Sequence, residues 1–227
     1  IGIANQLCKM LHINPGMKFV NKQGRLLLDW PRPQVLSSQG WNASYRFHQP
    51  DLEVLLRQAV QSHPNITVKT EMELLHLGQK SDHVSLQCLA GDSGLTSRMT
   101  ASYVVGCDGA RSSVRQAMGV SMENLGFRQS WLVVDVLLYS EMPELGDHSV
   151  QFCDAERPMT YCRSPKNRRR WEITMQAGES AGEMTDPDRV WQFLSRWITP
   201  DDGQIERSVV YTFESALAET WRKDRLL

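Results

Sequence analysis

The stretch Tyr103–Gly119, YVVGCDGARSSVRQAMG, guides the interpretation of the whole chain. It begins with apolar residues, continues with Gly106, Asp108 and Gly109, and ends in a segment of helical character. Glycine lets a backbone approach a ligand closely, and the start of a helix carries unpaired N–H groups that attract anions. The pattern therefore predicts a strand, a turn and a helix that face a phosphate or a sugar.

Three charged residues of this stretch are candidates for ligand contact. The Asp108 carboxylate can cap the helix or accept a hydrogen bond from a sugar hydroxyl. Arg111 and Arg115 are four residues apart, so we expect them on one helix face, where they suit a dinucleotide phosphate. On the glycine–aspartate turn alone, however, a plain strand–turn–helix with a capping aspartate is the better interpretation.

The whole string resembles the Asp-Gly fingerprint of the class A flavoprotein monooxygenases, the family of p-hydroxybenzoate hydroxylase and phenol hydroxylase. The matching positions are Gly106, Asp108, Gly109, Arg111, Ser112 and Arg115. In that family the segment lies beside FAD and is linked to flavin and NAD(P)H binding. The resemblance implies that the cofactor-binding residues include Asp108, Gly109, Arg111 and Arg115.

A second segment, YRFHQPDLE at Tyr45–Glu53, precedes a predicted helix with Pro50 in its first turn. It is similar to the family's Gln-Pro-x-Leu-Glu segment, whose glutamine lies near the flavin. The resemblance therefore implies that Gln49 is a further cofactor-binding residue. Without the first motif, Gln49 is simply a polar residue at the start of a helix.

The chain as a whole predicts an α/β (α+β) fold. Strand patterns, which include a hairpin around Asn21–Gly24 and strands at 66–77 and 84–90, alternate with helical ones up to about residue 124. From Trp131 onward β-rich segments dominate, among them 159–163, and one helix is expected at 186–198. The resemblance implies part of a Rossmann-like FAD domain plus a β-sheet substrate domain, as in p-hydroxybenzoate hydroxylase. We expect residues 1–126 to form a partial FAD-binding domain with a hairpin insertion, residues 127–214 the substrate-binding sheet, and residues 215–227 a return to the FAD domain.

The second half resembles the 3-(3-hydroxyphenyl)propionate hydroxylase branch at Trp131–Asp135, Cys153–Pro158 and Arg169–Glu172. The resemblance implies a sheet that walls an aromatic pocket, and a phenylpropionate-type phenol as substrate. The candidate substrate residues are Gln151, Tyr161 and Arg163. They lie on predicted strands, and alternation places all three on one face. An arginine there can hold a substrate carboxylate bidentately, although a solvent-facing position on the sheet is the better interpretation for each residue taken alone.

Three family elements are absent from the sequence. These are the early GxGxxG unit, the acidic residue that ends its second strand, and the Gly-Asp motif that in the family follows a segment like Trp221–Leu227. We therefore expect the chain to be the middle of a longer hydroxylase that uses FAD, NAD(P)H and O₂. The isolated piece is expected to be inactive and to lose FAD. A same-fold epoxidase or dehydrogenase, or a module without catalysis, stays open.

Composition limits the remaining classes of function. The formal net charge is −1, which gives no electrostatic case for nucleic acid or an anionic membrane surface. The five cysteines form no CxxC pair, and their odd number favours free thiols in the cytoplasm. No histidine lies at metal-ligand spacing from a cysteine, so no metal is expected. The expected partners are a small aromatic substrate and O₂, and a homo-oligomer is left open.

Overall fold

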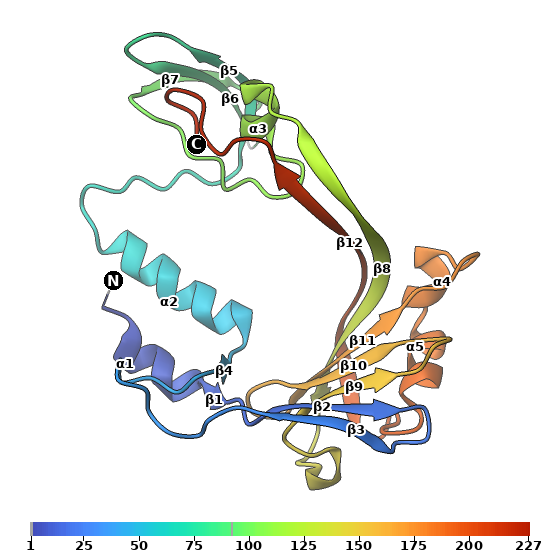
Figure 1. Ribbon diagram of the computed structural model, residues 1–227. Coiled ribbons are helices and arrows are strands. Elements are labelled where there is room, and N and C mark those ends of the chain that lie inside the picture. Colours follow the sequence, from blue (N-terminus) through green and yellow to red (C-terminus); the bar gives the residue numbers. More distant parts are fainter. Residues whose placement is uncertain (1, 92) are drawn as a thin grey trace. The chain divides into compact units, whose positions relative to one another are not determined.

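The computed structural model describes residues 2–91 and 93–227 as a mixed α/β structure, as the sequence predicts (Figure 1). It has two compact units, residues 1–63 with 128–213 and residues 64–127 with 214–227. The helices are α1 (Ala4–Leu7), α2 (Gln49–Gln61), α3 (Ser113–Met118), α4 (Ala181–Thr185) and α5 (Pro187–Leu194), with 3₁₀ turns η1 (Cys8–Met10) and η2 (Pro143–Leu145). The strands are β1 (His12–Ile13), β2 (Gly16–Asn21), β3 (Leu26–Pro31), β4 (Tyr45–Arg46), β5 (Met72–Gln79), β6 (Val84–Ala90), β7 (Thr96–Ala101), β8 (Met122–Leu138), β9 (Ser149–Cys153), β10 (Met159–Arg163), β11 (Arg168–Thr174) and β12 (Gly203–Ala218).

A seven-stranded sheet in the order β12-β8-β11-β10-β9-β2-β3 dominates the first unit. Strands β8, β11, β10 and β9 pair antiparallel in turn, whereas β9 and β2 are parallel. The predicted hairpin around Asn21–Gly24 is confirmed as the antiparallel pair β2–β3. Because paired residues share a face of a sheet, these registers decide which side chains meet.

One face of this sheet is the hydrophobic core of the unit. Leu132, Val134 and Val136 alternate along β8 and are fully buried. Helices α4 and α5 supply Met184, Val190 and Leu194 to the same cluster (Figure 1). Trp171 on β11 is completely buried there, and its ring centroid lies 5.3 Å from that of Tyr161 and 6.0 Å from that of Trp197. The opposite face of the same strands carries polar side chains.

The second unit contains the antiparallel sheet β5-β6-β7 and helix α3. Val114 and Met118 of α3 pack with Val84 and Leu226 in a small core. The segment that ends in Gly106 pairs with the last residues of the chain, because Val104 forms a parallel bridge to Leu226 and its N–H donates to the Arg225 carbonyl at 2.9 Å. The strand segment that leads into the turn Gly106–Gly109 is thereby held by hydrogen bonds to the last residues of the chain.

Two predicted elements differ from the structure. The strand expected at 66–77 begins only at Met72, because Ile66 and Val68 have a strand-like pattern but lie exposed with no partner strand. The helix expected at 186–198 is shorter as α5, and α4 precedes it. Residues 1–63 pack as one unit with residues 128–213, and the division into FAD-binding and substrate-binding portions stays a prediction.

A nearly enclosed ion pair secures the start of α4. The Arg157 guanidinium donates to both Glu179 carboxylate oxygens, at 2.7 and 3.0 Å, and the Gln176 amide donates to Oε2 at 2.8 Å. The hydrogen bonds from Arg157 hold the pKa of Glu179 at about 2, below its ordinary value of 4.5. Since the folded-state pKa is depressed, the stabilisation is fully present above about pH 4.5 and disappears as the pH falls towards 2.

We expect Glu179→Gln to lower the free energy of unfolding by about 1–2 kcal/mol at pH 7, because charge-assisted hydrogen bonds are lost. The deficit should shrink between pH 4.5 and pH 2, where the wild-type carboxylate is protonated. Urea titrations at several pH values measure both effects. Glu141→Gln, at an exposed position, is the matched control. A deficit that stays constant down to pH 2 would contradict the assignment.

Candidate functional site

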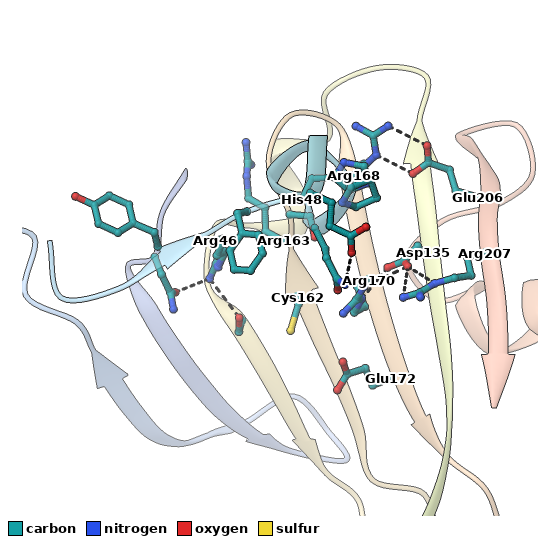
Figure 2. Close-up of a pocket in the computed structure, with 18 residues that line it drawn as sticks. Arg46, His48, Asp135, Cys162, Arg163, Arg168, Arg170, Glu172, Glu206 and Arg207 are labelled. Carbon is teal, nitrogen blue, oxygen red and sulfur yellow. Dashed lines mark hydrogen bonds and ion pairs between the residues drawn. The ribbon is translucent and has the colours of Figure 1, made fainter. Parts of the chain in front are cut away.

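A pocket of about 710 Å³ lies in the first unit, against the polar face of the large sheet (Figure 2). Its walls come from strands β8–β12 on one side and from the segment Tyr45–Pro50, at β4 and the start of α2, on the other. Pockets that enclose small molecules have volumes of roughly 300–1,000 Å³. The cavity is therefore large enough for a single-ring ligand.

Arg46 attaches the Tyr45–Pro50 segment to the sheet. Its guanidinium donates to the Asp147 carbonyl, to Asn14 Oδ1 at 2.8 Å and to Ser149 Oγ at 3.2 Å. Burial lowers the pKa of Arg46, and the nearby Asp147 carboxylate partly opposes that effect. Arg46 thus links three parts of the first unit, namely its own segment, Asn14 and the stretch 147–149, and fixes one wall of the pocket.

Ion pairs line the opposite wall. Asp135 on β8 accepts hydrogen bonds from Arg170 Nε at 2.7 Å and Arg207 Nε at 2.8 Å (Figure 2). The hydrogen bonds that Arg170 donates to Asp135 raise the pKa of Arg170 above its ordinary value. Arg168 makes a two-point contact with Glu206 at 2.8 and 3.1 Å. These pairs join the three adjacent strands β11, β8 and β12.

Two other ionisable groups face the pocket from the middle of the sheet. Cys162 on β10 pairs with Arg170, and Glu172 on β11 pairs with Thr160, so these residues share the polar face. Burial raises the pKa of the Cys162 thiol. Burial also raises the pKa of Glu172, assisted by Asp135 and opposed by Arg170. Neither residue was singled out from the sequence, although the alternation Arg170-Trp171-Glu172 was a signal for a polar face beside a buried tryptophan.

The structure separates the three predicted substrate residues. The register pairs Gln151 with Thr160, whereas Tyr161 pairs with Val150, so Gln151 faces away from Tyr161. The prediction of one shared face is therefore wrong. The prediction assumed alternation along each strand, but the sequence does not define the register between β9 and β10. Tyr161 is only 2% exposed and lies in the core, where burial raises its pKa.

The other two predicted substrate residues, Gln151 and Arg163, have different surroundings. Gln151 is held by Met159, whose carbonyl accepts from Nε2 at 3.0 Å, and by Thr160, whose hydroxyl donates to Oε1 at 2.8 Å. Arg163 ends β10 and lines the pocket, with its Nε 3.0 Å from Asp147 Oδ1. Of the three, Arg163 is the one positioned to meet a ligand in this pocket.

Gln49 is the first residue of α2 and also lines this pocket. Its side-chain amide donates to Glu53 Oε1 at 2.9 Å, one helical turn along α2. The structure thus brings Gln49 and Arg163 to one cavity in the first unit. The other predicted cofactor-binding residues belong to the second unit.

Asp108 caps helix α3. Its Oδ2 accepts from the Ser113 and Val114 amides at 2.6 and 3.2 Å, and Ser112 Oγ accepts from the Arg115 amide at 3.0 Å. Partial burial opposes ionisation, but hydrogen bonds from the Ser112 side chain and from these backbone amides outweigh it and lower the pKa of Asp108. The prediction that Asp108 caps the helix is therefore confirmed, whereas the expectation of unpaired N–H groups at this helix start is wrong, because Asp108 and Ser112 already accept from them.

The two arginines of this stretch do not share a helix face. Helix α3 begins at Ser113, so Arg111 lies in the preceding turn with an exposed side chain. Arg115 folds back to donate to the Ala110 carbonyl at 3.0 Å. The sequence did not show that the helix begins only at Ser113, where Asp108 and Ser112 accept hydrogen bonds from its first amides.

The two glycines of the turn serve different purposes. A Cβ atom at Gly106 would lie 2.7 Å from Val114 Cβ, so glycine is needed there for α3 to pack closely. Gly109 has a φ of +80° and no heavy atom within 4 Å of a built Cβ. Its exposed backbone is open to a ligand.

Neither a cluster of metal-ligating side chains nor a membrane-spanning helix is found in the part of the chain that the structure describes. Residues 2–91 and 93–227 contain no group of three or more histidine, cysteine, aspartate or glutamate side chains arranged to hold a metal ion. The helices within these ranges are too short or too polar to cross a membrane.

The cap predicts a measurable stability effect. We expect Asp108→Ala to lower the free energy of unfolding by about 1 kcal/mol, because two amides at the start of α3 lose their acceptor. Asp108→Asn should cost clearly less, because the amide oxygen can still accept. Urea denaturation compares the variants, and hydrogen exchange at Ser113 and Val114 localises the effect. Equal stability of the alanine variant and the wild type would refute the capping role.

Comparison with known proteins identifies relatives along the whole chain. A family model described as FAD binding domain matches residues 1–227. A probable NADH-specific resorcinol 4-hydroxylase of Rhodococcus jostii (strain RHA1) is 29% identical over 229 residues, covering 100% of this chain and 42% of that protein. A 3-(3-hydroxy-phenyl)propionate/3-hydroxycinnamic acid hydroxylase of Klebsiella pneumoniae (strain 342) is 28% identical and covers 100% of this chain and 40% of that protein. The chain thus spans about 40% of the length of these curated relatives.

Solved structures share the fold. The p-nitrophenol 4-monooxygenase PnpA from Pseudomonas putida DLL-E4 superposes with a TM-score of 0.84 at 16% identity, covering 100% of this chain and 57% of that one. The flavin-dependent monooxygenase PieE, solved with FAD and substrate, gives 0.81 at 18% identity, covering 99% of this chain and 42% of that one. Since the family model matches every residue, this chain belongs to the FAD binding domain family.

Proposed function

We propose that the chain is the middle portion of a flavoprotein monooxygenase that hydroxylates a phenolic aromatic acid with FAD, NAD(P)H and O₂. The observation that carries this proposal is the match of the FAD binding domain model to all 227 residues. Relatives named as hydroxylases of resorcinol and of 3-(3-hydroxy-phenyl)propionate support a phenolic ring as the substrate. Our leading substrate is of the 3-(3-hydroxyphenyl)propionate type.

The pocket of the first unit supports an aromatic acid as ligand. Its volume suits one ring with a short side chain. Arg163 reaches it from the end of β10, and a guanidinium binds a carboxylate through two parallel hydrogen bonds. We assign Arg163 to the acid group of the substrate. Gln151 instead supports the sheet, and Tyr161 supports the core.

The residues present fit FAD in part. The exposed Gly109 backbone and the Arg111 side chain, free to turn outward, suit a dinucleotide phosphate. Asp108 and Arg115 shape that turn through the hydrogen bonds described above. Gln49 stands at the pocket, where we place it near the flavin. Bound FAD, reduced by NAD(P)H, would supply the oxygen-transfer chemistry, while the protein orients the ring and keeps water away.

The cysteines agree with a reducing compartment. Cys8, Cys88, Cys107, Cys153 and Cys162 are all free thiols. Disulfides are rare in the cytosol because thiols there are kept reduced. We therefore place the protein in the cytoplasm, with a small aromatic substrate and O₂ as its partners.

The test uses the full-length protein that contains this sequence. We expect it to purify with bound FAD, to oxidise NAD(P)H faster when 3-(3-hydroxyphenyl)propionate or resorcinol is added, and to form a product with one more ring hydroxyl in amounts equal to the O₂ consumed. As a comparison, the 227-residue chain alone should purify without flavin. Mass spectrometry of the product and flavin absorbance provide the measurements.

Two outcomes would count against the proposal. A full-length protein that binds no flavin would be a module without catalysis. A protein that oxidises its substrate without inserting oxygen into the ring would be a dehydrogenase of the same fold. Stoichiometric flavin on the 227-residue chain would show that the other segments are not needed for retention.

A further inference from the structure

Glu172 on β11 is one of the residues that line the pocket, and Figure 2 shows it below the other labelled side chains. It stands on β11 between Thr160 of β10 and Val133 of β8, which are its partners in the sheet register. Trp171 and Ile173 on either side point into the core and are completely buried. The backbone on both sides of Glu172 is thus fixed by packing, and its carboxylate is held towards the cavity.

The neighbours of Glu172 are already engaged with other groups. The Thr160 hydroxyl donates to Gln151 at 2.8 Å, and Val133 offers no polar atom. Arg170, two residues away on the same face, donates to Asp135 through Nε at 2.7 Å and Nη2 at 3.2 Å. The Arg170 guanidinium therefore directs these two hydrogen bonds to another carboxylate, although its charge still acts to lower the pKa of Glu172.

The other acidic side chains of the pocket have partners. Asp135 is bound by two arginines, Glu206 by Arg168, and Glu53 by Gln49. Within the described ranges 2–91 and 93–227, the Glu172 carboxylate makes no hydrogen bond or ion pair with the protein (Figure 2). A half-enclosed carboxylate costs free energy unless a donor satisfies it. The Glu172 oxygens are not among the fully buried atoms without a partner, so water can supply that donor in the free protein, and a ligand that displaces the water must supply it instead.

The charge balance of the pocket limits what the donor can be. Five arginines line it, namely Arg46, Arg163, Arg168, Arg170 and Arg207, against four carboxylates, Glu53, Asp135, Glu172 and Glu206. Asp147, whose Oδ1 lies 3.0 Å from Arg163 Nε, balances the fifth arginine, so the pocket has no excess of negative charge that would favour an ammonium ligand. An uncharged donor such as a ring hydroxyl can meet Glu172 without disturbing this balance.

We propose that Glu172 recognises the ring hydroxyl of the substrate by accepting its hydrogen bond, and so selects phenols over rings that lack the hydroxyl. This assignment rests on the proposed function. A site with a buried acceptor discriminates against a ligand without the hydroxyl, because the acceptor is then left unpaired. Glu172 also orients the ring, since the hydroxyl is fixed at one point of the sheet while the acid group extends towards Arg163.

The test measures binding of two ligands that differ only in the hydroxyl. Isothermal titration of the full-length, FAD-loaded protein gives dissociation constants for 3-(3-hydroxyphenyl)propionate and 3-phenylpropionate. We expect the wild type to prefer the hydroxylated ligand by roughly 30-fold, and Glu172→Gln to reduce that preference at least about fivefold, because a charged acceptor is replaced by a neutral one. Affinity for 3-phenylpropionate should change by less than about twofold.

Glu144→Gln is the control, because it removes a carboxylate at an exposed position of η2 in the same unit. It should keep the full preference. A wild type without preference, or a Glu172→Gln protein that keeps it, would overturn the assignment. Formation of hydroxylated product is measured in a separate assay. If binding behaves as expected but no hydroxylated product forms, the proposed function fails while the binding role of Glu172 stands.

Discussion

The alternation of side chains along β11 is the constraint on which the rest of the first unit depends. Trp171 is completely buried against Tyr161 and Trp197, and a fully buried tryptophan contributes several kcal/mol through the apolar surface that it removes from water. Once its position is fixed, the pleat of the strand sends Arg170 and Glu172 to the opposite side. The hydrophobic core and the polar pocket are therefore two faces of the same strands, and shifting the strand by one residue would destroy both.

The ion pairs of the pocket wall follow from this arrangement. Arg170 and Asp135 face one another because β11 and β8 pair at those two residues. Arg207 approaches the same carboxylate from β12 and completes its neutralisation. Half-buried carboxylates are tolerated when they are paired in this way. Among the residues that the structure describes, Glu172 is the carboxylate on this face that has no such arginine partner, and for that reason its side chain can accept a hydrogen bond from a ligand.

The sequence predicted those features that depend on local pattern. The bounds of β6 and β10 and the β2–β3 hairpin follow from alternation and from the turn Asn21–Gly24. The family followed from the long string around Asp108, which is more specific than a single glycine turn.

Features that depend on contacts distant in the sequence were not predictable. The relative facing of Gln151 and Tyr161 is set by the β9–β10 register, which alternation within one strand does not define. The capping of α3 by Asp108, by contrast, is a local contact that the sequence did predict, and the hydrogen bonds from the Ser113 and Val114 amides confirm it. Glu172 was missed because its importance depends on its neighbours Thr160 and Arg170, which form hydrogen bonds with other residues. Only the three-dimensional arrangement shows those hydrogen bonds.

The most direct measurement is a crystal structure of the full-length protein with FAD and 3-(3-hydroxyphenyl)propionate. The account predicts that the ring lies against the polar face of the sheet, with its hydroxyl oxygen at a hydrogen-bond distance of about 2.5–3.0 Å from a Glu172 carboxylate oxygen and its acid group beside Arg163. A ligand bound away from this face, or one whose hydroxyl meets a different residue while Glu172 faces only solvent, would contradict it.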